Sequence, residues 1–117
     1  MPDDQVKTIL AAVWGPHCRL VGDEYVEKIE KASAAGTPVD KIIATARGGD
    51  NFDWVESIRI LAEAAEIIVA MLELYKAAHG VLSKRDLAAK AKAELVKPGA
   101  NPAVASKVEA AADLIAK

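Results

Sequence analysis

Two pairs of glutamates have the spacing at which carboxylates on one helix can share a metal ion. Glu27 and Glu30 are three residues apart, and so are Glu63 and Glu66. Residues three apart lie on the same side of an α-helix, and carboxylate oxygens are ligands that Mg²⁺ prefers in proteins. Two such pairs facing each other would bind Mg²⁺ and, through the metal, the phosphates of a substrate. One hypothesis is therefore a Mg²⁺-dependent all-α hydrolase of nucleotides or other phosphorylated metabolites that uses these four residues.

The same carboxylates have neighbours that would neutralise them at the surface. Glu27 lies four residues before Lys31, and Arg59 lies four residues before Glu63. Opposite charges at this spacing form ion pairs on an exposed helix face. Glu66 lies within the most apolar stretch of the sequence, so its position matters most to the hydrolase hypothesis. We therefore expect surface ion pairs, with neither a resident metal ion nor another cofactor.

A group of basic residues follows in the last third of the chain, and its members are Lys84, Arg85, Lys90 and Lys92. A basic helix face contacts nucleic-acid phosphates readily, so a further hypothesis is a weak nucleic-acid binder that uses these side chains. However, the whole chain has a formal net charge of −2, and a lysine-rich exposed face is usually only solvated. Nucleic acid is not the partner that we expect.

One imidazole and the only thiol are adjacent in the sequence, at His17 and Cys18. A catalytic cysteine needs a base and an orienting group that the fold brings together, and direct sequence neighbours seldom have that geometry. Two histidines and one cysteine are also too few for a zinc site unless carboxylates join them. We expect a loop histidine and a small, half-buried thiol.

The same inventory bears on the compartment in which the protein works. A single cysteine excludes an intrachain disulfide, which fits a reducing environment. The polar, acidic segment 1–5 is unlike the basic and then apolar layout of a signal peptide. The longest apolar run, residues 67–72, is too short to cross a bilayer. We therefore expect a cytoplasmic protein with no membrane partner.

The elements that must position these residues are predicted to be helices. Hydrophobic residues form 52% of the chain and aromatic residues only 4%, and the excess is alanine, the strongest helix former. Apolar residues recur at helical spacing, and no segment has the alternation of a strand. Glycines, prolines and capping residues divide the chain into six predicted helices, which span about 3–14, 23–35, 37–47, 51–79, 83–96 and 101–116. Residues 15–22 are predicted to be a connection that has room for one helical turn through Cys18, Arg19 and Leu20.

Four of these helices begin at a recognisable capping pattern. A capping residue is followed by an acid three positions later, or by proline at the first helical position. The patterns are Thr37-Pro38 with Asp40, Asp50 with Asp53, Ser83 with Asp86, and Asn101-Pro102.

The segment 51–79 determines the expected architecture. Its charged residues follow one narrow stripe of a helix, and they are Glu56, Arg59, Glu63, Glu66, Glu73 and Lys76. A helix that is apolar over the rest of its circumference is normally surrounded by other elements. We therefore predict an all-α fold, a compact single-domain bundle of five or six helices over residues 1–117, with this long helix at its centre.

Charge is unevenly distributed along the chain. Residues 1–79 hold 8 Lys/Arg and 13 Asp/Glu, a net charge of −5, whereas residues 80–117 hold 7 and 4, a net charge of +3. This layout is compatible with head-to-tail self-association. Together with the alanine-rich helices and the lack of a catalytic constellation, it predicts a small non-enzymatic module that binds another protein or itself. An adaptor, regulatory, immunity-type or assembly protein would have such a sequence.

Overall fold

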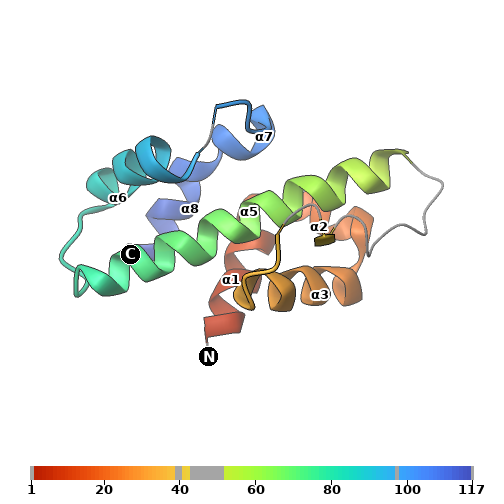
Figure 1. Cartoon of the computed structure of the whole chain (residues 1–117), viewed down its shortest axis with the longest axis horizontal. Coiled ribbons are helices and arrows are strands. Elements are labelled where there is room, and N and C mark those ends of the chain that lie inside the picture. The colour runs from red at the N-terminus through yellow and green to blue at the C-terminus, as the bar shows by residue number, and fades with distance from the viewer. Residues whose placement is uncertain (1, 39–40, 43–51, 97, 117) are drawn as a thin grey trace. The chain divides into compact units, whose positions relative to one another are not determined.

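A computed structural model describes residues 2–38, 41–42, 52–96 and 98–116, and side chains from residue 5 onward except at 52–55. Within these ranges every regular element is helical, which confirms the predicted all-α class (Figure 1). Most of the predicted helix over 37–47 and the predicted cap at Asp50 and Asp53 lie outside the described residues. The elements are α1 (Pro2–Val13), α2 (Gly15–Val21), α3 (Asp23–Ala34), α5 (Phe52–Ala77), α6 (Lys84–Lys90), the π-helix η1 (Ala91–Leu95), α7 (Pro102–Ala105) and α8 (Val108–Ile115).

The chain divides into two compact units, unit 1 over Met1–Glu66 and unit 2 over Ile67–Lys117. The boundary lies inside α5, whose bounds agree with the predicted long helix over 51–79. The position of α5 at the centre of a bundle, and a single domain over 1–117, stay predictions.

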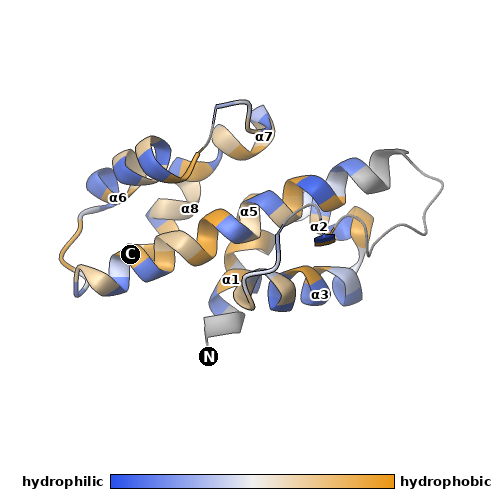
Figure 2. Cartoon of the chain, in the orientation of Figure 1, coloured by the Kyte–Doolittle hydropathy of each residue, from blue (hydrophilic) through white to orange (hydrophobic). Residues whose placement is uncertain are grey.

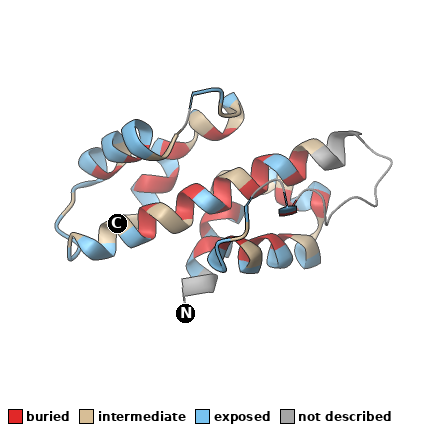
Figure 3. Cartoon of the chain, viewed as in Figure 1, coloured by how far each residue is buried: buried red, intermediate tan, exposed pale blue. Residues whose placement is uncertain are grey.

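Among the described residues, unit 1 includes the short helices α1, α2 and α3 and the first part of α5. α1 packs against α2 and α3, and α2 packs against α3. The buried side chains include Val6, Ile9, Leu10, Trp14, Val26, Ile29, Ile58 and Leu61 (Figure 3). On α3 they recur three to four residues apart, so hydrophobic and hydrophilic residues alternate around its turns (Figure 2). This periodicity is what turns one side of α3 to the core.

The predicted connection over 15–22 is a helix for most of its length. Pro16 lies in the first turn of α2, where the N–H that proline lacks has no helical partner in any case. The Trp14 carbonyl oxygen accepts hydrogen bonds from the N–H groups of His17 and Cys18, both at 3.1 Å. Proline therefore ends α1 and also begins the next helix.

The end of α3 agrees with its prediction. The N–H of Gly36 donates to the Ser33 carbonyl oxygen at 3.1 Å, and the N–H of Thr37 donates to Ala32 at 2.9 Å. This pair of bonds is a Schellman motif, which needs a left-handed residue at Gly36, and glycine takes its φ of 81° without strain.

Unit 2 has an apolar core. α6 packs against α8 and continues directly into η1. The buried side chains of unit 2 include Ile68, Met71, Leu87, Ala91, Val104, Val108, Ala111 and Ala112. The predicted caps are confirmed, because the Ser83 hydroxyl accepts from the Asp86 N–H at 3.2 Å and the Asn101 side chain accepts from the Ala103 N–H at 2.9 Å.

The helix predicted over 83–96 changes type at its middle. α6 ends at Lys90 and is followed by η1, after which the N–H of Val96 donates to the carbonyl oxygen of Ala91, five residues earlier, at 3.1 Å. A π turn differs from an α turn only in this shift of one hydrogen-bond partner. Sequence periodicity over so short a segment does not reveal it.

The helix predicted over 101–116 is broken in two. The N–H of Lys107 donates to Val104, three residues earlier, at 3.1 Å, and α8 resumes when the Ala111 N–H donates to Lys107. The tight turn falls at Ser106, a weak helix former. The apolar stripe survives the break, because Val104 and Val108 are both buried.

Candidate functional site

The four glutamates of the hydrolase hypothesis lie in unlike environments. Glu27 and Glu66 are exposed, Glu30 is buried, and Glu63 is half-buried. Each predicted pair therefore has one carboxylate facing the interior and one facing solvent. Among the side chains that the structure describes, no three acids, histidines or cysteines are grouped so that they could hold a metal ion.

Buried oxygen atoms without a hydrogen-bond partner occur at Ser33 and Glu63. Ser33 on α3 is 8% exposed and its Oγ has no partner, and the Oε2 atom of Glu63 on α5 is also buried without one. Ser33 lies three residues after Glu30 and seven after Val26, so all three share the inner face of α3. The sequence analysis singled out Glu30 and Glu63 but not Ser33, although the helical spacing of Ser33 from Val26 was the available signal.

The predicted ion pairs on α3 and α5 are not formed. No ion pair joins Glu27 to Lys31 or Arg59 to Glu63 among the described residues. Lys28 instead lies over the ring of Tyr25, 5.2 Å from its centroid. The exposed carboxylates of α3 therefore form no ion pair with any described cation.

His17 contacts a serine that is distant in sequence. Its Nδ1 lies 3.2 Å from the Oγ of Ser57 on α5. A histidine beside a serine resembles the start of a nucleophilic pair, but Ser57 is only 3% exposed. A nucleophile must reach its substrate, so this hydrogen bond fits a structural tie between α2 and α5.

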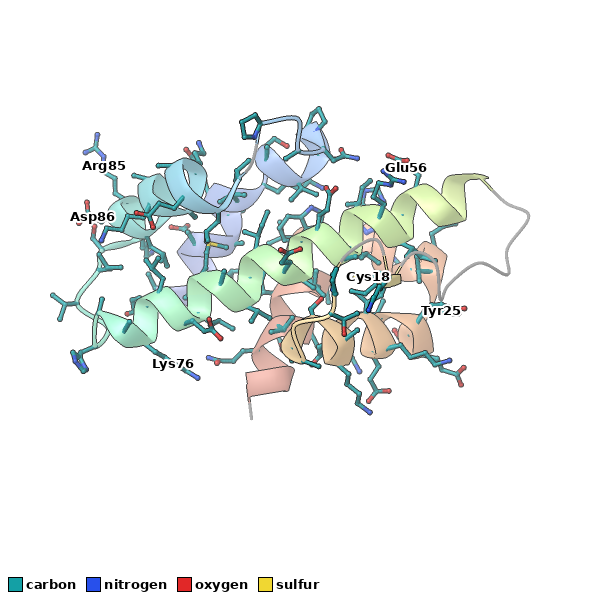
Figure 4. The ribbon with its side chains drawn as sticks, viewed as in Figure 1. Cys18, Tyr25, Glu56, Lys76, Arg85 and Asp86 are labelled. Carbon is teal, nitrogen blue, oxygen red and sulfur yellow. The ribbon has the colours of Figure 1, made fainter. Side chains whose placement is uncertain are left out.

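Cys18 is more deeply buried than the half-buried thiol expected from the sequence (Figure 4). Burial raises the pKa of the Cys18 thiol, and the negative charge of Asp23 raises it further. Since the thiolate is the reactive form of cysteine, both effects keep this side chain unreactive at neutral pH.

The basic side chains of the nucleic-acid hypothesis are all exposed, and they are Lys84, Arg85, Lys90 and Lys92. Two of them pair with carboxylates of α8. Lys84 Nζ lies 3.9 Å from Asp113, and Lys92 donates a hydrogen bond to Glu109. That hydrogen bond, with the positive charge of Lys92, lowers the pKa of Glu109. Half of the basic group is therefore occupied within unit 2.

Exposed apolar side chains occur in both units. Leu20 at the end of α2 is 48% exposed, Val81 between α5 and α6 is 82% exposed, and Leu114 on α8 is also exposed. None of the helices in the described ranges is both long enough and apolar enough to span a membrane.

Comparisons of the chain with protein-family models, with curated proteins and with solved structures give no match. Function must therefore be argued from the chain's own side chains. The buried side chains that could take part in chemistry, Cys18, Glu30 and Ser57, all belong to unit 1. The exposed side chains described above are charged or apolar.

Proposed function

We propose that this protein is a small non-enzymatic helical module that acts by binding protein, including copies of itself. The observation that carries the proposal is the opposite charge of the two structural units. Residues 1–66 hold 12 Asp/Glu and 7 Lys/Arg, a net charge of −5, and residues 67–117 hold 5 and 8, a net charge of +3. Oppositely charged surfaces attract over about 8 Å at physiological salt.

The exposed apolar side chains support the same proposal. Leu20 belongs to the acidic unit and Val81 to the basic unit. A protein interface commonly has an apolar centre and a charged or polar rim. Each unit therefore offers both of the ingredients that an interface uses. We further propose that the protein works in the cytoplasm, where a lone thiol such as Cys18 stays reduced.

Light scattering on the purified chain at two concentrations tests the proposal. At low ionic strength the weight-average mass should rise above that of a single chain when the concentration is raised about a hundredfold. A strictly monomeric chain at the higher concentration would remove self-association from the proposal.

A second candidate is the Mg²⁺-dependent hydrolase, which one observation favours. The buried Oε2 atom of Glu63 has no hydrogen-bond partner, and a buried polar atom of this kind is often satisfied by an ion or water. A ligand that binds only the folded state raises the melting temperature. A rise with MgCl₂ or MnCl₂ that is lost in Glu63→Gln would favour this candidate, and an unchanged melting temperature would remove it.

A further inference from the structure

The segment that joins α5 to α6 presents an apolar side chain among cations. Val81 is 82% exposed, and residues 76–86 contain three Lys/Arg, one histidine and a single acid, Asp86, which follows Arg85 in the first turn of α6. Lys84 and Arg85 are exposed at the start of α6, where Arg85 is labelled in Figure 4. We name Val81, Lys84 and Arg85 the basic patch.

The position of these cations is unfavourable for α6 itself. Lys84 and Arg85 are the first two residues of the helix, and the positive end of the helix dipole disfavours cations there. Lys84 is partly offset by Asp113 at 3.9 Å, whereas Arg85 forms no ion pair with a described residue. The stability of α6 therefore does not account for Arg85.

The end of α2 and the start of α3 present an apolar side chain among acids. Leu20 is 48% exposed, and Asp23, Glu24 and Glu27 are exposed on the first two turns of α3. None of the three carboxylates forms an ion pair with a described residue. We name these four residues the acidic patch. The nearest cations in the chain are Arg19, which is exposed beside Leu20, and Lys28, which is exposed beside Glu27. Lys28 lies over the ring of Tyr25, 5.2 Å from its centroid, and forms no ion pair with a described residue.

Each patch combines one exposed apolar side chain with charged side chains, and the charges of the two patches are opposite. In each, one large apolar side chain is flanked by charges that lack partners or have a distant one. On the basis of the proposed function, we propose that the basic patch of one copy binds the acidic patch of a second copy. Such a head-to-tail contact leaves one free patch at each end, so it builds either a closed ring or an open chain of copies.

Charge reversal in the full-length chain tests this contact. One variant carries Glu24→Lys and Glu27→Lys, and the other carries Lys84→Glu and Arg85→Glu. The second variant should keep α6 folded, because carboxylates are favoured in the first turn of a helix and the exposed contact of Lys84 with Asp113 at 3.9 Å, which the variant loses, contributes little to stability. A control variant with Glu73→Lys and Glu94→Lys changes exposed acids of unit 2 and has the same net charge as the first variant. Circular dichroism should be used to check that the two reversed variants and the control variant are folded.

Each reversed variant alone should associate at least about tenfold more weakly than the wild type, since like charges then face each other. The control should associate as the wild type does. Mixing the two reversed variants should restore association, and sedimentation should show complexes that contain both chains. Val81→Ser should weaken association in the wild-type background.

Three outcomes would overturn the contact. If wild type associates but the reversed variants associate equally well, the patches are wrong while the proposed function stands. If wild type associates, both variants do not, and their mixture stays monomeric, the two patches do not bind each other. A wild-type chain that never associates removes both this contact and the self-binding part of the proposed function.

Discussion

Unit 1 and unit 2 differ in what their cores contain. The core of unit 1 includes three polar side chains, Glu30, Ser33 and Ser57, whereas no polar side chain described in unit 2 is buried. Burying a polar group costs free energy unless a hydrogen bond compensates. Ser57 has His17 as its partner, but the Oγ of Ser33 has none. Unit 1 therefore carries stability costs that unit 2 avoids.

The surfaces differ in the opposite sense. In unit 2 the cations Lys84 and Lys92 pair with carboxylates of α8, whereas the exposed acids of α3 in unit 1 form no ion pair with any residue that the structure describes. Unit 1 is acidic and unit 2 is basic, so the acids that lack partners and the excess cations are on different units. The groups available for binding are therefore the charged side chains at the surfaces of the two units, and they are different from the polar side chains buried in the core of unit 1.

The largest expected effect is the loss of the biggest core side chain of unit 1. Trp14 is fully buried, so Trp14→Ala should lower the free energy of unfolding by about 3–5 kcal/mol. Leu87→Ala in unit 2 should cost about 2–5 kcal/mol. Urea unfolding followed by circular dichroism measures both, with Leu20→Ala as the exposed control. A loss below about 1 kcal/mol for Trp14→Ala would contradict the packing of unit 1.

The helix ends give a matched comparison of the two units. α5 also ends in a Schellman motif, with the Gly80 N–H donating to Tyr75 and the His79 N–H donating to Lys76. His79 therefore has a left-handed φ of 56°, where α3 has Gly36. A side chain in this conformation costs about 1–2 kcal/mol.

Adding a side chain at one of these helix ends and removing one at the other should change the free energy of unfolding in opposite directions. Gly36→Ala should destabilise the protein by about 1–2 kcal/mol, although its Cβ would meet no atom within 4 Å. His79→Gly should stabilise it by about 0.5–1 kcal/mol, because the more flexible unfolded chain offsets part of the gain. Melting temperatures measure both changes, and equal signs would contradict the two conformations.

The two buried serines should respond to alanine with opposite signs. Ser33→Ala removes a buried hydroxyl without a partner and adds a better helix former, so it should stabilise by about 1 kcal/mol. Ser57→Ala removes the hydrogen bond between Ser57 and His17 and should destabilise by about 1 kcal/mol. Denaturant unfolding of both variants decides this, and a destabilised Ser33→Ala would show that its hydroxyl has a role in the core.

The smallest expected effect concerns the pair of Lys92 and Glu109 in unit 2. The pKa of Glu109 is lowered from 4.5 in the folded chain by Lys92. A carboxylate with a lowered pKa stabilises the fold above its unfolded pKa, and the stabilisation is lost as pH falls through the folded value. Glu109→Gln should therefore be slightly less stable than wild type at neutral pH and equally stable at about pH 2. Because the pair is exposed, the difference should also vanish at about 1 M salt.

The sequence predicted the elements better than it predicted their inner faces. The caps at Ser83 and Asn101 and the end of α3 at Gly36 follow from side-chain chemistry within a few residues. The burial of Glu30 beside the exposure of Glu27 does not, because two residues three apart differ by only about 60° around the helix. Packing against other elements decides which of them faces the core.

The break between α7 and α8 was missed for a related reason. Val104 and Val108 keep helical spacing across it, so the apolar pattern is the same for one helix or two. The candidate binding patches were predictable only as charges. The exposure of Val81 and Leu20 depends on what packs on them.

The salt dependence of the wild-type mass tests whether acidic unit 1 of one copy attracts basic unit 2 of another. Sedimentation of the full chain should show complexes larger than a monomer at about 20 mM NaCl and monomers at about 500 mM, because salt screens the attraction between acidic unit 1 and basic unit 2. A mass equal to one chain at both salt concentrations, or association that strengthens with salt, would contradict the account.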